Sequence, residues 1–254
     1  MKSLQKLLVF VVGVAGLISC TSTKTIQKNI NASSYSLAYL MDSKISDVKT
    51  DIQLAVDTVY FNTSSLADTT VVNKEKGWFL PLVFVYVWNS QNNCVQGKSM
   101  IEEDIPSFAK KSMIDEINRS GNFNSGPLHS ADYTIELSID QIEAKGPYVS
   151  NGFFYFALYA YGYSYSDRAG PAISNLTVSY KLKKDGQVVH RNSFQSEKMT
   201  EQINKRYNNP AMLQQDYAIS MVEATSYNFK NVIESIVRDL NTYFSKPLTQ
   251  DMRF

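Results

Sequence analysis

The chain has 254 residues, 44% of them hydrophobic, and a formal net charge of +1 at pH 7. This composition can bury a sizeable core and fits one large domain or two small ones. Basic residues stand in isolated pairs such as Lys110-Lys111. The charge pattern therefore argues against nucleic-acid binding, which needs clustered positive charge.

The N-terminus has the features of a secretory signal. Lys2 and Lys6 supply positive charge, and an apolar run follows over 7–18. The run is too short to span a bilayer as a helix, which needs about 20 residues, and it fits the apolar core of a signal peptide. It ends in Leu17-Ile18-Ser19-Cys20, which resembles the lipobox of bacterial lipoproteins.

The lipobox resemblance implies removal of the signal peptide 1–19 and lipid attachment to Cys20, a membrane anchor that contains palmitate or a similar acyl chain. Thr21 stands where Asp would favour the inner membrane, so we expect an outer-membrane lipoprotein facing the periplasm rather than the cell surface. The polar, aperiodic residues 20–34 predict a lipidated flexible tether. A single domain is expected over 35–246 and a loose tail over 247–254.

Alternating hydrophobic patterns predict the strands. Period two over 49–61 favours a half-buried strand, and the polar residues 63–73 favour a loop. The apolar run 78–88 favours one strand buried on both faces. Alternation over 132–144 favours another strand, with a possible bulge. A hairpin is expected over 175–194, turning at Asp185-Gly186.

Apolar residues three or four positions apart predict two helices. The first covers 104–120, with Asp104 as its cap and Gly121 as a left-handed stop. The second covers 210–244 and is long enough for a kink near Tyr217. Together these elements predict an α+β fold: a mixed, mostly antiparallel sheet with two helices packed on one face.

An aromatic segment over 153–165, FFYFALYAYGYSY, is the most unusual part of the chain. As a single strand it would place five tyrosines on one face. One interpretation is that they cover the sheet. The other is contact with a partner or a membrane, for which tyrosine is suited by its large area and polar tip. The five candidate contact residues are Tyr155, Tyr159, Tyr161, Tyr163 and Tyr165.

The short motifs that could indicate catalysis, metal binding or cofactor binding are incomplete in this sequence. The sequence therefore predicts no catalytic residue, no metal site and no cofactor. His129 and His190 belong to no short metal pattern. Gly97-Lys98-Ser99 lacks the glycine that a phosphate loop needs five positions earlier. The second cysteine, Cys94, has no partner for a disulfide and is expected to be buried. Asp68-Thr69-Thr70 resembles a bacterial O-glycosylation pattern, which makes Thr69 a candidate acceptor.

Two motifs and a hairpin carry a further resemblance. Ser120-Gly121-Asn122-Phe123 ends the predicted helix, and Ala131-Asp132-Tyr133 opens the next strand. With the hairpin over 176–190, they resemble auxiliary lipoproteins of envelope ABC transporters and related assembly lipoproteins, across about half the chain. This implies a non-enzymatic accessory module with an envelope protein partner. The alternatives are a stand-alone lipid or glycan binder and a hydrolase of envelope polymers. The sequence leaves the oligomeric state open.

Overall fold

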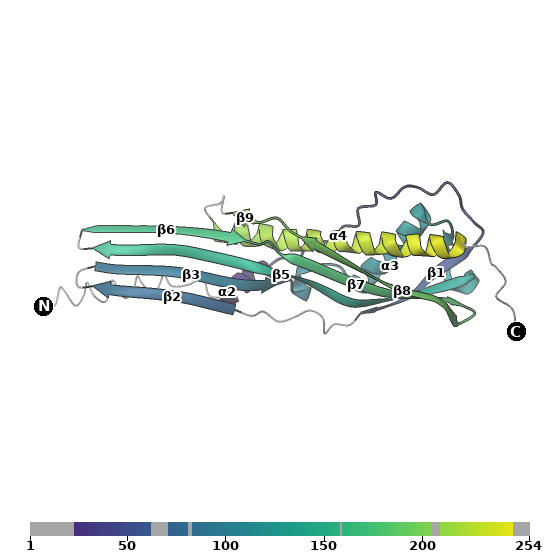
Figure 1. Ribbon diagram of the computed structural model, residues 1–254, viewed down its shortest axis with the longest axis horizontal. Coiled ribbons are helices and arrows are strands. Elements are labelled where there is room, and N and C mark those ends of the chain that lie inside the picture. Colours follow the sequence, from purple (N-terminus) through teal and green to yellow (C-terminus); the bar gives the residue numbers. More distant parts are fainter. Residues whose placement is uncertain (1–22, 62–70, 81–82, 158, 205–208, 246–254) are drawn as a thin grey trace.

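The computed structural model describes residues 23–61, 71–80, 83–157, 159–204 and 209–245. The molecule is elongated, with its longer helices gathered over one end of a long sheet (Figure 1). The helices are α2 (Thr23–Ile30), α3 (Ile105–Ser120) and α4 (Pro210–Ser245), with short 3-10 turns at Lys98–Met100 and Leu128–Ser130. The strands are β1 (Gln53–Phe61), β2 (Val71–Leu80), β3 (Val83–Val95), β4 (Asn124–Ser125), β5 (Tyr133–Ala157), β6 (Ala160–Ala169), β7 (Ile173–Lys184), β8 (Gln187–Met199) and β9 (Ile203–Asn204).

The sheet is built around β5, which spans 25 residues. Its first half pairs in parallel with β1 and antiparallel with β7, and its second half pairs antiparallel with β3 and β6. The predicted mixed, mostly antiparallel sheet is therefore confirmed. The expected bulge lies between Ile139 and Gln141, shortly before β5 changes partners.

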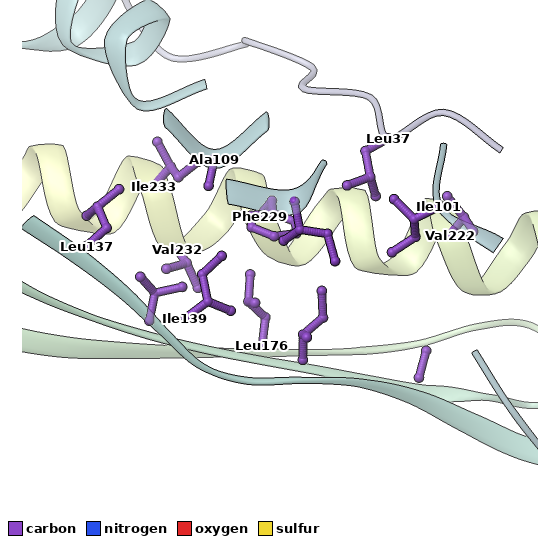
Figure 2. Packing of buried hydrophobic residues seen from close by; sticks show 14 of the residues in the cluster. Leu37, Ile101, Ala109, Leu137, Ile139, Leu176, Val222, Phe229, Val232 and Ile233 are labelled. Atoms are coloured by element: carbon purple, nitrogen blue, oxygen red, sulfur yellow. The ribbon is translucent and has the colours of Figure 1, made fainter. Parts of the chain in front are cut away.

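Helix α4 forms the centre of the core, and it is continuous through Tyr217, where a kink was considered. Its apolar residues recur every three or four positions, so they cover more than one side of the helix. Figure 2 shows Leu137, Ile139 and Leu176 of the sheet beneath α4, with Leu37 and Ala109 on its other side. The helix is thus held between the sheet and a second layer.

The prediction of two helices on one face is only partly confirmed. α4 packs along β7 and β8, whereas α3 contacts β1 and α4, and a third helix, α2, also packs against α4. The Asp104 carboxylate caps α3 by accepting from the Ser107 N–H, as predicted. Gly121 is not a left-handed stop, because its φ is −69°. A Cβ there would lie 2.6 Å from the Ile117 carbonyl oxygen, so close approach explains the glycine.

The flexible tether predicted over 20–34 is wrong for the residues that the structure describes. Thr23–Ile30 forms α2, and Ile26 and Ile30, four positions apart, are both buried in the core. The Gln27 side chain pairs with the Val95 backbone: its Nε2 donates to the carbonyl at 2.9 Å and its Oε1 accepts from the N–H at 3.4 Å. The polar composition concealed this docking, since only one narrow stripe of α2 is apolar.

Two aromatic runs predicted as single strands are hairpins instead. The run 78–88 is divided between β2 and β3, and the segment 153–165 between β5 and β6. β2 also begins within the stretch that was expected to be a loop. Apolar residues continue across both reversals, so hydrophobicity did not mark the turns. The signal peptide 1–19, Cys20, Thr69 and the tail 247–254 lie outside the described residues.

The aromatic arm as candidate interaction site

Two hairpins project together from the helix-covered body and end at the same level (Figure 1). We call this region the aromatic arm: β2, residues 83–90 of β3, 150–157 of β5 and 160–167 of β6. Its strands lie in the order β2-β3-β5-β6, and each neighbouring pair is antiparallel. The described helices lie over the rest of the sheet, so the arm is a single layer among the described residues (Figure 1).

One face of the arm is rich in aromatic residues. Residues directly opposite each other on antiparallel strands point to the same face. Tyr86 on β3 lies opposite Phe154 on β5, which lies opposite Tyr163 on β6. Equivalent rows across the three strands lie two residues nearer the tip and two residues nearer the body. This face continues the one on which α4 packs in the body. Its described aromatic residues are Phe84, Tyr86, Trp88, Phe154, Phe156, Tyr161, Tyr163 and Tyr165.

The opposite face of the arm carries an apolar patch on its two central strands. It presents Val83, Val85 and Val87 from β3 beside Phe153 and Tyr155 from β5. The Phe153 and Tyr155 rings lie 6.4 Å apart between centroids, with nearly parallel planes. A sheet with one solvated face normally alternates apolar and polar residues. The arm does not alternate in this way, so both of its faces are suited to apolar contact.

Glycines make room for rings on both faces of the arm. A Cβ on Gly152 would lie 2.2 Å from Cζ2 of Trp88, and one on Gly162 would lie 2.3 Å from Cε1 of Tyr155. Each ring therefore lies over the backbone of the neighbouring strand, where any larger residue would displace it. Such cross-strand coverage of a glycine fixes the register of a sheet.

The five predicted contact tyrosines do not share a face, which corrects the single-strand interpretation. The chain reverses between Ala157 and Ala160, so Tyr155 points to one side of the arm and Tyr161, Tyr163 and Tyr165 point to the other. Tyr159 lies in the turn at the tip and is 99% exposed. Tyr161 and Tyr163 are 73% and 68% exposed, whereas Tyr165 is half-buried.

A polar cluster closes the apolar zone where the arm meets the body. The buried Asp167 carboxylate accepts from the Ser150 hydroxyl at 2.7 Å and from the Tyr148 hydroxyl at 3.2 Å. The Trp88 indole N–H donates to the Ser150 oxygen at 3.3 Å. Burial first, and then the nearby Asp167 charge, raise the pKa of Tyr148, so its hydroxyl stays protonated as a donor. These bonds tie β3, β5 and β6 together at the root of the arm.

A second candidate site is a groove of about 890 Å³ beside α4. Its walls come from residues 35–40, from the segment after β8 and from one side of α4. Tyr35 and Ile219 line it, and Lys198 lies 4.5 Å above the centre of the Tyr227 ring at its edge. The groove combines apolar walls with charged side chains of both signs, Lys198 and Lys230 beside Glu201 and Glu223.

Two polar clusters in the body have structural explanations. The Asp239 carboxylate accepts from Tyr180 and Asn192 and lies 3.0 Å from His190 Nε2, so His190 joins β8 to α4. The buried Glu116 accepts from the Tyr39 hydroxyl at 2.9 Å and fastens the N-terminal segment to α3.

The remaining candidates from the sequence also have definite positions. His129 is exposed in a short 3-10 turn. Cys94 is buried and unpaired, as predicted, and burial raises the pKa of its thiol to about 12. Within the described ranges, groups of three or more His, Cys, Asp or Glu side chains that could hold a metal ion do not occur. Helices long and apolar enough to cross a membrane are likewise absent from those ranges.

The comparisons with known proteins leave the family open. The sequence matches no family model and no curated protein. Among solved structures, a crystal structure of a Xanthomonas campestris protein assigned to the family DUF330 aligns with 81% of this chain and 91% of its own. The sequence identity is 10% and the TM-score is 0.40, a likeness too weak to establish a shared fold or function.

Proposed function

We propose that this chain is a lipid-anchored, non-catalytic accessory module of an envelope transport or assembly system, and that the aromatic arm contacts the other component. The observation that carries the proposal is a sheet with apolar residues on both faces, which no helix among the described residues covers (Figure 1). Exposed apolar patches of this kind mark interaction sites on soluble domains.

The free energy available from covering the exposed rings supports a binding role for the arm. An aromatic side chain can bury roughly 150–250 Å². At about 25 cal/mol per Å², covering one exposed ring contributes a few kcal/mol. Tyr159, Tyr161 and Tyr163 are each more than two-thirds exposed, so this gain remains available to a partner. Their hydroxyl groups can still bond to water or to a partner, which suits a surface that is sometimes free.

The position of α2 supports action close to a membrane. If Cys20 carries lipid, only two residues separate it from Thr23, the first residue of α2. Three Cα steps reach about 10 Å, so the lipid would hold α2 almost at the membrane surface. Because α2 is bonded to Val95, at the body end of β3, the root of the arm would lie near that surface too.

Photocross-linking in native membranes tests this proposal. We would place p-benzoylphenylalanine at Tyr161, on the arm, and at Tyr60, an exposed tyrosine of β1 in the body. One dominant envelope protein should be captured from position 161 and not from position 60, and Cys20→Ser should abolish the capture. Equal capture at both positions, or capture that survives Cys20→Ser, would contradict the proposal.

The groove beside α4 supports a second candidate function, binding of a lipid or glycan without a protein partner. Its volume lies within the range of small-molecule sites. Native mass spectrometry of the protein purified from membranes would detect a retained ligand. Ile219→Glu, which places a charge in the groove wall, should release it, whereas Val189→Glu on exposed β8 should not. Retention in both variants would remove this candidate.

A further inference from the structure

The outer strand β6 of the aromatic arm differs from the other long edge of the sheet. Over the described residues, β6 pairs with β5 alone from Ala160 to Ser164, and β2 pairs with β3 alone. Both outer strands therefore present N–H and C=O groups to the side. Such an edge is a template for another strand unless something blocks it.

The usual means of blocking an edge are missing from β6. The sequence from 160 to 166, AYGYSYS, contains neither a charged residue nor proline. The pairings of β2 with β3, β3 with β5 and β5 with β6 run without a register shift, so no bulge turns the edge away. In contrast, β8 at the body edge carries Arg191, Glu197 and Lys198, and its pairing with β7 is shifted after Leu182.

We infer that the aromatic arm pairs edge to edge with a second copy of this chain, the outer edge of β6 in one copy lying against that of β2 in the next. The strand directions fit this arrangement. β2 runs towards the tip of the arm and β6 runs away from it (Figure 1). When two arms point the same way, β6 and β2 meet antiparallel and continue the ladder already present within each arm.

The lipid anchor, which is part of the proposed function, argues against pairing of β6 with β6. Two β6 strands would pair antiparallel only if their arms pointed in opposite directions, which would place the two bodies, and their lipids, at opposite ends. Copies anchored in one membrane can share a direction, and then β6 meets β2. The interface is head to tail, so it can add further copies and close into a ring. The edges of the arm would bind further copies of the chain, and both faces of the arm would remain available to the envelope partner.

Mass measurement of the full lipidated protein in detergent gives the first test. The wild-type chain should show a mass of two or more copies. The inferred partner strand β2 carries Lys74 and Lys76, so Ala160→Lys with Ser164→Lys on the β6 edge would set like charges against each other and should shift the protein to a monomer. Val189→Lys with Ser193→Lys is the matched control, because it adds the same charges at the same spacing to exposed positions of β8. A monomeric wild type, or an arm variant that keeps its assembly, would overturn the inference.

Disulfide trapping between differently tagged chains gives the second test. Residues directly opposite each other on antiparallel strands have Cα atoms about 4.5–5.5 Å apart, within disulfide range. Chains with Ser164→Cys would be mixed with chains carrying Lys74→Cys or Lys76→Cys on β2. Native Cys94 stays silent because it is 1% exposed. Trapping between positions 164 and 74 or 76 supports the inference, and trapping only between two copies of position 164 overturns it. Capture at Tyr161 tests the proposed function separately.

Discussion

The body and the aromatic arm share one sheet but differ in what stabilises them. In the body, α4 covers the sheet and is itself covered by α3 and the N-terminal segment, so its side chains have neighbours on several sides (Figure 2). In the arm, the ring contacts between described residues run within one strand, as between Tyr86 and Trp88, or to the next strand, as between Phe84 and Phe154. The body sheet contains three register shifts and the pairings of the arm contain none.

This difference suggests that the body supplies most of the stability and that the arm supplies the contact surface. Burial between layers contributes most of the free energy of folding, and no second layer lies over the arm among the described residues. Changes in the arm should therefore leave the body folded, and changes in the core of the body should destabilise the whole chain. A sheet of regular register with apolar residues on both faces is an aggregation risk for an isolated molecule. Its presence here is accounted for if something else covers it.

Removal of a core ring should have the largest effect. Phe229 of α4 is fully buried, and its ring meets Phe108 edge-on at 5.3 Å. Phe229→Ala should lower the free energy of unfolding by about 3–5 kcal/mol, because it removes apolar contact and leaves a cavity. Phe153→Ala, the same change on the arm, should lower it by about 0.5 kcal/mol. Urea titration followed by circular dichroism would measure both, and equal losses would break the comparison.

The pH dependence of stability should belong to the body. Burial alone would raise the pKa of Asp239, but hydrogen bonds from Tyr180, His190 and Asn192 outweigh it and hold the pKa below its usual range. A lowered pKa stabilises the fold above the unfolded value of about 3.9, and this contribution is lost as the pH falls through the folded pKa. Asp239→Asn should cost about 1 kcal/mol at pH 7 and flatten the acid limb of a stability curve.

Glu234 should behave in the opposite way and provides the control. Burial raises its pKa, with a further rise from the nearby Glu116 charge that Lys230 partly offsets. A raised pKa gives a contribution that is present below the unfolded value and lost as the pH rises through the folded one. Glu234→Gln should therefore stabilise the protein at pH 7. A loss of stability in this variant would show that the ionised carboxylate is favoured.

Substitution of a glycine in the arm should loosen the arm locally and leave the stability of the body unchanged. In Gly152→Val the new side chain would collide with Trp88, so the indole must leave Ser150 and the root of the arm must loosen. We expect faster hydrogen exchange over residues 149–157 and 160–167, with little change in the thermal midpoint. Ser164→Val, which adds the same side chain at an exposed position of β6, is the control. Global unfolding of Gly152→Val would show that the arm is part of the folding core.

Sequence patterns predicted the body well and the arm poorly, for a physical reason. Helices over 104–120 and 210–244 and the hairpin at Asp185-Gly186 were correct because one side of each faces a core, which imposes a period. The arm has no buried side to contrast with an exposed one. Its run of apolar and aromatic residues therefore continued through positions 158–159, where no Gly, Pro, Asn or Asp marks a turn.

The candidate site was found by composition and misplaced in detail. The concentration of tyrosine drew attention to 153–165, and these residues do lie on the uncovered part of the sheet. The contribution of β3 was missed, because 78–88 was interpreted as a strand buried on both faces. Tyr86 and Trp88 stand beside Phe154 only through pairing between strands about 60 residues apart. Periodic patterns in a single sequence do not show which distant strands become neighbours in the sheet.

The smallest effect on stability should accompany the sharpest effect on function. Tyr159→Ser with Tyr161→Ser removes two rings that are 99% and 73% exposed, so the free energy of unfolding should change by less than about 0.5 kcal/mol. Partner capture by the tagged, lipidated protein should nevertheless fall at least tenfold, since each ring would bury its area only in the complex.

Tyr60→Ser, on exposed β1 in the body, is the matched control for this last prediction and should leave capture unchanged. If the double variant unfolds, the tip of the arm belongs to the core and the separation of folding from contact is wrong. If it folds and still captures the partner, contact passes through another surface, and the groove beside α4 becomes the stronger candidate. Only loss of capture in a folded double variant, with the control intact, assigns the apolar area of the arm tip to binding.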